Sequence, residues 1–75
     1  LNIFPNPNNG NFTIETNNAQ KQILQIFDVT GNMVMSQVII GKVNIDGSLL
    51  NEGVYNICIT NGDGGVINKR MMVVK

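Results

Sequence analysis

The sequence predicts an all-β domain, a β-sandwich of about seven short antiparallel strands with Greek-key connections. Short apolar or alternating runs recur along the 75 residues, and turn-forming residues separate them roughly every 10 positions. No segment of adequate length repeats its apolar residues with the helical period. We therefore expect essentially no helix.

The clearest element is a β-hairpin over Gln22–Ile40, QILQIFDVTGNMVMSQVII. In its turn, residues 28–32, Asp28 can accept hydrogen bonds from nearby backbone N–H groups and Gly31 supplies a positive φ. The first strand is so rich in branched and bulky apolar residues that we expect both of its faces to be covered. In the returning strand both alternating sets of side chains are partly apolar, so the pattern does not fix which set faces inward.

The chain before the hairpin predicts two strands joined by a rigid elbow. Residues 1–4 form a short apolar strand, which the sequence PNPNNG at positions 5–10 ends. Each proline fixes φ and removes a backbone donor, so the elbow holds one shape. Residues 11–16 then alternate, with Phe12 and Ile14 facing inward.

After the hairpin, residues 42–46 predict a weak edge strand with Val43 and Ile45 inward. In the connection that follows, we expect Leu49 and Leu50 to plug the end of the core. A further strand begins at Gly53 and places Tyr55, Ile57 and Ile59 on one face.

The sequence NGDGG at positions 61–65 is a strong hairpin-turn signal, and residues 66–74 should pair back onto the strand that begins at Gly53. Tyr55 at the start of that strand predicts a tyrosine corner, with Gly53 letting the backbone pass close beneath the ring. An ordinary core tyrosine with a solvated hydroxyl is the alternative.

Composition excludes several classes of protein. Five basic and five acidic residues give a formal charge of zero, and the basic residues do not cluster, which argues against nucleic-acid binding. No apolar run approaches the roughly 20 residues that span a bilayer, so we expect no membrane insertion. Because the chain opens at Leu1 without a signal sequence, we interpret residues 1–75 as a single domain cut from a longer protein.

Nothing in the sequence predicts catalysis, a metal site or a cofactor. Histidine is absent, which removes the common general base and metal ligand. Cys58, the only cysteine, is expected to be a small buried apolar residue, and the four methionines are expected to be core filler. The turn at Asp28 resembles the opening of a calcium loop, but Met33 and Ile39 stand where its glycine and its closing glutamate belong.

Several pieces of the chain together resemble the C-terminal sorting domain of the type IX (Por) secretion system of Bacteroidetes. In chain order they are Phe4-Pro5-Asn6-Pro7 with Gly10, Ile26-Phe27-Asp28-Val29-Thr30-Gly31, Leu50 with Gly53-Val54-Tyr55, and Lys69-Arg70-Met71-Met72-Val73-Val74-Lys75. The resemblance covers the whole chain. Cys58 and the doubled methionine depart from the plain branched aliphatic residues expected at those positions.

The resemblance implies an immunoglobulin-like fold and a role as an address label. Such domains end secreted cargo proteins, which enter the periplasm by an ordinary signal peptide. The folded domain is then recognised by the outer-membrane translocon and its barrel-type shuttle protein. A sortase-like cysteine peptidase usually removes it, and the N-terminal cargo domain is released into the medium or anchored at the outer-membrane surface. The domain itself would not be an enzyme.

The residues that match the family pattern are candidates either for recognition or for holding the fold. For the glycines and Tyr55 we favour a role in the fold. The terminal strand, residues 69–75, is the stronger candidate for direct contact, because its free end could pair with a receptor by β-augmentation. Ordinary pairing within the domain stays open as the alternative. The candidates are Pro5, Asn6, Pro7, Gly10, Asp28, Gly31, Gly53, Tyr55, Lys69 and Lys75.

Two other roles stay open from the sequence. One is an adhesive or carbohydrate-binding module at the cell surface, which would need exposed aromatic residues; the four aromatic residues are all expected to lie in the core. The other is a passive spacer domain.

Overall fold

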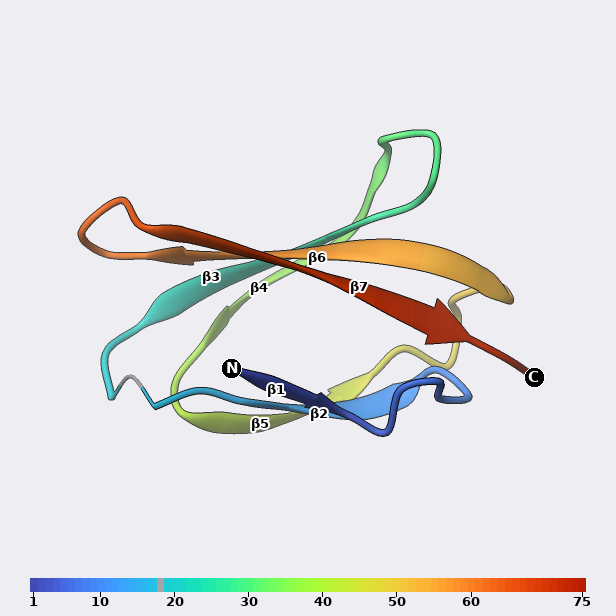
Figure 1. The fold of residues 1–75 in the computed structure, drawn as a ribbon, viewed down its shortest axis with the longest axis horizontal. Helices are drawn as coiled ribbons and strands as arrows, with labels where there is room; N and C mark the ends of the chain where they lie inside the picture. The colour runs from blue at the N-terminus through green and yellow to red at the C-terminus, as the bar shows by residue number, and fades with distance from the viewer. Residues whose placement is uncertain (18) are drawn as a thin grey trace.

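A computed structural model describes residues 1–17 and 19–75, and its regular structure is β-strand throughout, as predicted. Figure 1 shows two sheets stacked as two layers, with the smaller sheet below the larger. The strands are β1 (Asn2–Phe4), β2 (Asn11–Glu15), β3 (Gln22–Phe27), β4 (Met33–Ile39), β5 (Lys42–Asp46), β6 (Gly53–Asn61) and β7 (Val66–Val73).

The strand order explains how a short chain closes a core. One sheet has the order β1-β2-β5 and the other β4-β3-β6-β7, and neighbouring strands pair antiparallel. The chain changes sheet between β2 and β3, between β4 and β5, and between β5 and β6. This arrangement is consistent with the immunoglobulin-like sandwich. The edge position predicted for residues 42–46 is confirmed, because β5 lies at the end of its sheet and, among the described strands, pairs with β2 alone.

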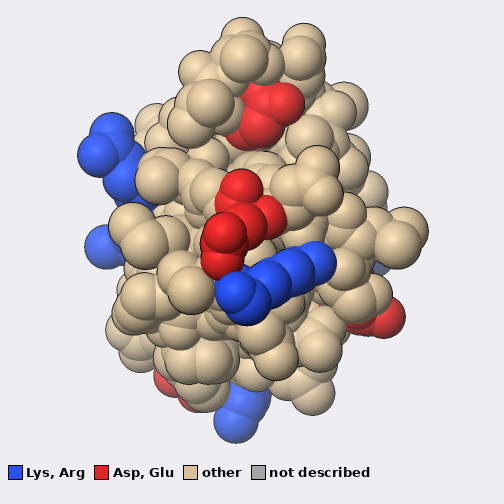
Figure 2. All heavy atoms as spheres, turned by 90° about the vertical axis from the view of Figure 1, so that its right-hand side faces the viewer, with Lys and Arg blue, Asp and Glu red and all other residues tan. Residues whose placement is uncertain are grey.

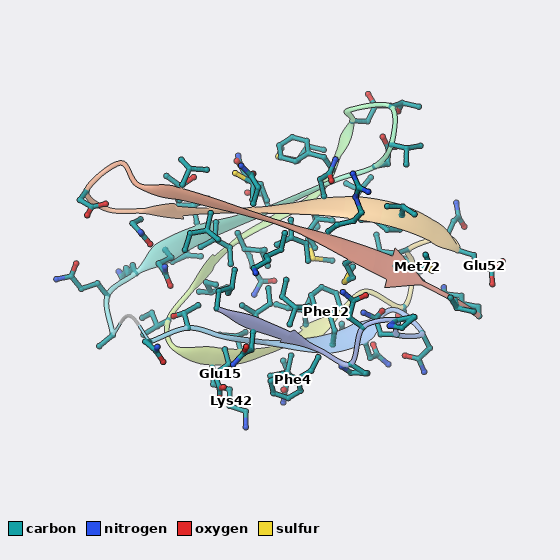
Figure 3. All side chains as sticks on the ribbon, in the orientation of Figure 1. Phe4, Phe12, Glu15, Lys42, Glu52 and Met72 are labelled. Atoms are coloured by element: carbon teal, nitrogen blue, oxygen red, sulfur yellow. The ribbon has the colours of Figure 1, made fainter. Side chains whose placement is uncertain are left out.

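The core lies between the sheets and contains most of the side chains predicted to face inward. Alternation along β2 and β6 correctly placed Phe12 and Ile14, and Tyr55, Ile57 and Ile59. In Figure 3, Phe12 points into the space between the two sheets. The buried apolar residues are Phe12, Ile14, Leu24, Ile26, Ile39, Ile45, Leu50, Tyr55, Ile57, Ile59, Met71 and Val73.

The predicted hairpin forms, but only one face of β3 is covered. Leu24 and Ile26 are buried, while Ile23 is exposed, so the prediction of two covered faces was wrong. The smaller sheet covers one side of the larger sheet, and the other side is left to solvent. The structure also settles the orientation of β4: Ile39 is buried and Met35 packs against the core, whereas Val38 is exposed.

Leu49 is the largest departure in the connection from β5 to β6. Leu50 is buried as predicted, but the side chain of Leu49 is 96% exposed. The backbone N–H of Leu50 donates to the carbonyl of Gly47 at 2.9 Å, which closes a turn. Leu49 sits within that turn and is directed away from the core, so only one of the two leucines plugs it.

Exposed side chains correct two further expectations, namely that all the aromatic residues lie in the core and that the methionines fill it. Phe4 is 42% exposed on the short edge strand β1, and the Lys42 ammonium lies 5.9 Å from its ring centroid. Figure 3 shows both residues on the side of the smaller sheet that faces away from the core. Met71 fills the core, but Met33 and Met72 are exposed. Sequence alternation does not reveal that an edge strand is left uncovered on one face.

Cys58 is half-buried and is not a core residue. It lies opposite Gln25 on β3 and Asn68 on β7, so all three share the outer face of the larger sheet. Its neighbours Ile57 and Ile59 take the two inward positions. The prediction of a buried thiol was therefore wrong, because Cys58 faces the outer side of the sheet while its two neighbours face the core.

Candidate recognition surface

The elbow after β1 runs along the edge of the last strand. We call residues 5–9 the strap. The Asn8 N–H donates to the Met72 carbonyl at 3.0 Å, and the Val74 N–H donates to the Asn8 carbonyl at 2.7 Å. The Asn6 side chain adds two bonds, from its Nδ2 to the Arg70 carbonyl and from the Met72 N–H to its Oδ1, both 3.1 Å. The two ends of the chain are thus tied together.

The strap occupies much of the β7 edge at which a receptor strand was expected to pair. β7 is an edge strand, but the strap already bonds the Arg70 carbonyl, both backbone groups of Met72 and, just after the strand, the Val74 N–H. β-Augmentation along residues 70–74 would require the strap to leave. The end of this strand is therefore paired within the domain.

Asn8 holds the strap in shape and was missed from the sequence. Its side chain is 5% exposed, its Nδ2 donates to the Pro5 carbonyl at 3.1 Å, and its Oδ1 accepts from the Gly10 N–H at 2.8 Å. Both peptide bonds that precede the strap prolines are cis. In a chain with many turn asparagines, nothing in composition distinguishes Asn8 from Asn9. Asn8 differs from Asn9 through its backbone bonds to Met72 and Val74, which are far away in the sequence.

Gly10 is required by a close backbone crossing. The Gly47 N–H donates to the Gly10 carbonyl at 2.8 Å, and a Cβ built on Gly10 would lie 2.6 Å from the Gly47 carbonyl oxygen. Gly10 also has φ of 110°, in the region that favours glycine. Gly47 is restricted in turn, because its Cβ would lie 2.5 Å from the Gly10 carbonyl oxygen. From the sequence, Gly47 is recognisable only as a residue of a connection, because the crossing joins segments far apart in the chain.

Tyr55 forms the predicted tyrosine corner. Its hydroxyl donates to the Asn51 carbonyl at 2.6 Å, and the ring is buried beside Leu50 in the core cluster. Gly53 does not serve the close approach that was expected, because a Cβ added there would meet no atom within 4 Å. The corner therefore depends on the tyrosine hydroxyl.

Replacing Tyr55 by Phe tests the corner. We expect the free energy of unfolding to fall by about 1 kcal/mol, because the ring keeps its packing while one partly buried hydrogen bond is lost. Urea denaturation monitored by far-UV circular dichroism measures the difference in the free energy of unfolding. Equal stability of the two proteins would show that the hydroxyl bond adds nothing.

The last residue is fixed to the connection before the corner. The Lys75 N–H donates to Glu52 Oε1 at 2.8 Å, and Lys75 Nζ donates to the Ser48 carbonyl at 2.8 Å. Figure 2, which views this end of the sandwich, shows acidic and basic side chains next to each other. Lys69, by contrast, lies along β7 opposite Ile57 and is exposed. The two lysines named from the sequence therefore have different surroundings.

Asp28 organises the β3–β4 turn, as predicted. Its Oδ1 accepts from the Thr30 hydroxyl at 2.6 Å, the Thr30 N–H at 2.9 Å and the Asn32 N–H at 3.0 Å. The Gly31 N–H donates to the Asp28 carbonyl, and Gly31 has the positive φ that was expected, 88°. The Thr30 hydroxyl, followed by the backbone N–H groups, lowers the pKa of Asp28 below its ordinary 3.8.

This lowered pKa predicts a pH dependence. A carboxylate whose pKa is lower in the folded state stabilises that state above its unfolded pKa, and the contribution is lost as pH falls through the folded pKa. Asp28→Asn should therefore lose less stability than the original protein as pH falls below the ordinary pKa of an aspartate and through the lowered one. Urea titrations at a series of pH values measure the difference. Parallel pH profiles for the two proteins would contradict the assignment.

Most of the motif residues meet at one end of the sandwich. A groove of about 360 Å³ at this end is lined by Asp28 from the β3–β4 turn, Tyr55 from β6, and Gly47 to Asn51 from the β5–β6 connection. The strap joins this end through the contact of Gly10 with Gly47, and Lys75 joins it through Ser48. Lys69 lies outside the group. We call this assembly, the strap with Gly10, Asp28, residues 46–55 and Lys75, the motif end.

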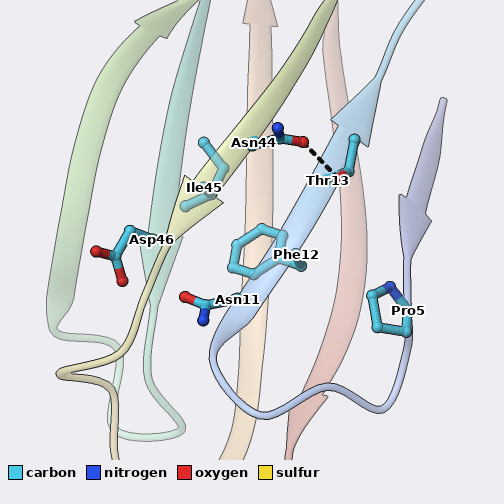
Figure 4. A pocket seen from close by; sticks show the side chains of 7 residues that line it. All are labelled: Pro5, Asn11, Phe12, Thr13, Asn44, Ile45 and Asp46. Atoms are coloured by element: carbon cyan, nitrogen blue, oxygen red, sulfur yellow. Dashed lines mark hydrogen bonds between the residues drawn. The ribbon is translucent and has the colours of Figure 1, made fainter.

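A second hollow of about 320 Å³ lies on the smaller sheet, next to the strap, and Figure 4 shows the side chains that line it. The Thr13 hydroxyl donates to Asn44 Oδ1 at 2.7 Å across β2 and β5. Asp46 is the one ionisable residue in its lining, and hydrogen bonds from the Ser48 backbone and side chain lower the pKa of that carboxyl. The hollow offers no second group to act as an acid or base with Asp46.

Within residues 1–17 and 19–75, no three His, Cys, Asp or Glu side chains come together in a way that would hold a metal ion. The same residues include no helix of the length and apolarity needed to cross a bilayer. What the chain does present is a group of turns fixed by hydrogen bonds at the motif end. The chain is thus a small β-sandwich with turns at one end that are fixed by hydrogen bonds.

The family is identified by comparison with known proteins. A family model described as the secretion system C-terminal sorting domain matches residues 2–75, and the chain belongs to that family. It is therefore a C-terminal sorting signal of the type IX secretion system, which directs its cargo to the cell surface or the medium. The family is one of sorting signals and is not a catalytic family. None of the curated proteins matches this chain.

Proposed function

We propose that the domain is recognised in its folded form through the motif end. Its receptors would be the type IX translocon and the outer-membrane barrel-type shuttle protein, met from the periplasm. A sortase-like peptidase would then cut the chain ahead of the domain, and the N-terminal cargo would be released or anchored. On this proposal residues 1–75 form one signal domain, and its part in that reaction is as a substrate.

The observation that carries the proposal is the fixed shape of the motif end. The strap is bonded to β7 by backbone and side chain, Gly10 is locked against Gly47, and Lys75 is held at both its N–H and its ammonium. A receptor that binds an already ordered surface avoids the entropy cost of ordering it. Turns fixed on a rigid scaffold are the usual carriers of recognition in β-sandwiches.

The resemblance supplied ten candidate residues, and the structure divides them by environment. Pro5, Asn6 and Pro7 are exposed on the strap, and Lys75 is exposed beside it, so these four are available for direct contact. Gly10 and Tyr55 are buried and support the surface from behind. We propose that Asp28, Gly31 and Gly53 set turn shapes, and that Lys69 plays no part in the motif end.

An export assay tests the proposal. The 75 residues are fused behind a periplasmic reporter in a host with a working type IX system, and the reporter outside the cell is measured. We expect export with the domain and none without it or with residues 69–75 deleted. Lys75→Ala should lower export several-fold in a domain that still folds, and Lys21→Ala, a matched exposed lysine outside the motif end, should not. Equal export by all of these fusions would contradict the proposal.

A further inference from the structure

The two sheets have four edge strands, and three of them are protected from pairing with another chain. Backbone groups along an open edge form a template for strand addition unless the edge is short, charged or covered. β1 has only three residues, β5 carries Lys42 at one end and Asp46 at the other, and β7 is covered by the strap over residues 70–74. The fourth edge strand is β4.

β4 has none of these protections along its regular part. No charged residue occurs between Asp28 and Lys42, so the whole of β4 is uncharged. Val34 and Val38 are exposed on it, Val38 by 59%. A β-bulge interrupts the pairing with β3 between Ile26 and Phe27, but Met35 to Ile39 pair regularly. Within the described residues, none of the backbone hydrogen bonds outside the strand ladders involves β4.

The register shows which backbone groups of β4 face outward. Successive residues of a strand direct their N–H and C=O groups to alternate sides. Met72 and Val74 face the strap, so Met71 faces β6 opposite Tyr55. Carrying the alternation through β6 and β3 directs Gln37 and Ile39 toward β3. Ser36 and Val38 therefore direct their N–H and C=O groups away from the sheet.

We propose that this edge binds the same edge of a second copy of the domain. With a two-fold axis at Gln37, Ser36 of each copy lies opposite Val38 of the other, and both residues are of the outward-facing kind. Each such pair of opposite residues exchanges two backbone hydrogen bonds. The two-fold axis produces two of these pairs, one on each side of Gln37. The two Gln37 amides meet on the axis. The larger sheets of the two copies then form one continuous sheet.

Three features favour a second copy as the occupant. An antiparallel strand edge is self-complementary under a two-fold axis, so no separate partner surface is needed. The formal charge of the chain is zero, so two copies approach without net repulsion. Val38 lies opposite Ile23 on β3, and both are exposed, so pairing brings this apolar row of each copy to the interface. Only one short strand per copy is buried, which makes the dimer weak.

Sedimentation equilibrium of the 75-residue protein, from about 10 µM to about 1 mM, tests the proposal in the concentration range of weak complexes. The average mass should rise from 8.2 kDa toward twice that value. Val38→Lys should weaken association at least about tenfold, because it places two ammonium groups on diagonal positions across the axis. Added salt should partly restore it. Val66→Lys is the matched control: Val66 is 53% exposed on the uncovered end of β7, and its substitution should leave association unchanged.

Ser36→Pro is a second, independent test. It removes an N–H that would face the partner, and it leaves the hydrogen bonds between β4 and β3 in place. It should reduce association as Val38→Lys does, with circular dichroism confirming the fold. The proposal is overturned if the original protein stays monomeric at the highest concentration, or if Val38→Lys and Val66→Lys associate equally. Loss of association in Val66→Lys alone would place the interface at β7 and would also overturn it.

Discussion

Gly10→Ala is expected to destabilise the domain by about 3 kcal/mol or more, the largest effect of any single substitution we predict. The new Cβ would lie 2.6 Å from the Gly47 carbonyl oxygen, and both atoms belong to backbone that cannot turn aside. The backbone of Gly10 also has a positive φ, which alone costs an alanine about 1 kcal/mol. A domain of only 75 residues has a margin of a few kcal/mol, so much of the variant should be unfolded at room temperature.

Gly31→Ala is the matched control for Gly10→Ala. Gly31 has a similar positive φ, but a Cβ there would meet nothing within 4 Å. Gly31→Ala should therefore lower the free energy of unfolding only by the cost of the positive φ, about 1 kcal/mol. Gly47→Ala should resemble Gly10→Ala, since its Cβ would approach the Gly10 carbonyl from the other side. Similar unfolding midpoints for Gly10→Ala and Gly31→Ala in urea would show that the crossing of residues 10 and 47 is not tight.

Asn8→Ala is expected to cost about 2 to 3 kcal/mol and to release the strap. The substitution removes the acceptor for the Gly10 N–H, a buried donor, and the donor to the Pro5 carbonyl. An unpaired buried polar group costs about 1 to 3 kcal/mol, which is more than the net value of an ordinary bond. The effect should also be local, because the strap is bonded to β7 at Met72 and Val74.

Amide hydrogen exchange separates release of the strap from general unfolding. In Asn8→Ala the Met72 and Val74 N–H groups, which the strap now protects, should exchange much faster than the Met71 N–H on the side that faces β6. Asn9→Ala is the control, because Asn9 is exposed and, among the residues that the structure describes, its side chain bonds only to the Asn11 N–H. Equal acceleration of all three amides would mean that the strap and β7 open together with the whole fold.

The strands were predictable because their signals are local. Alternation over five to nine residues placed Phe12, Ile14, Ile57 and Ile59 correctly, and the Asp28 and Gly31 turn follows from the residues of the turn itself. The predictions that failed concerned which strand faces are covered by the other sheet. Ile23, Phe4 and Met72 have the residue types of a core, but they lie where no second layer covers them. Residue type alone does not report which face of a strand meets the other sheet.

The candidate surface was predictable in part. The motif residues of the strap, the corner and the C-terminus were all named from the sequence, and the structure brings most of them together. The contacts that bring them together were not predictable. Asn6 bonds to Arg70, which is 64 positions later, and Gly10 meets Gly47 through backbone atoms. Asn8 and Gly47 carry no local signal beyond that of a turn. Such contacts depend on the register of strands from opposite ends of the chain.

The measurement that bears most directly on the role of this domain is reporter export by fusions to the original domain, to Gly47→Ala and to Gly31→Ala. If the machinery reads a folded surface, the original domain and Gly31→Ala direct the reporter out of the cell, and Gly47→Ala leaves it in the periplasm. Purified domains provide the stability of each variant. Export of Gly47→Ala at the level of the original domain, with that variant unfolded in solution, would show that the signal is read as a linear sequence and would contradict the account.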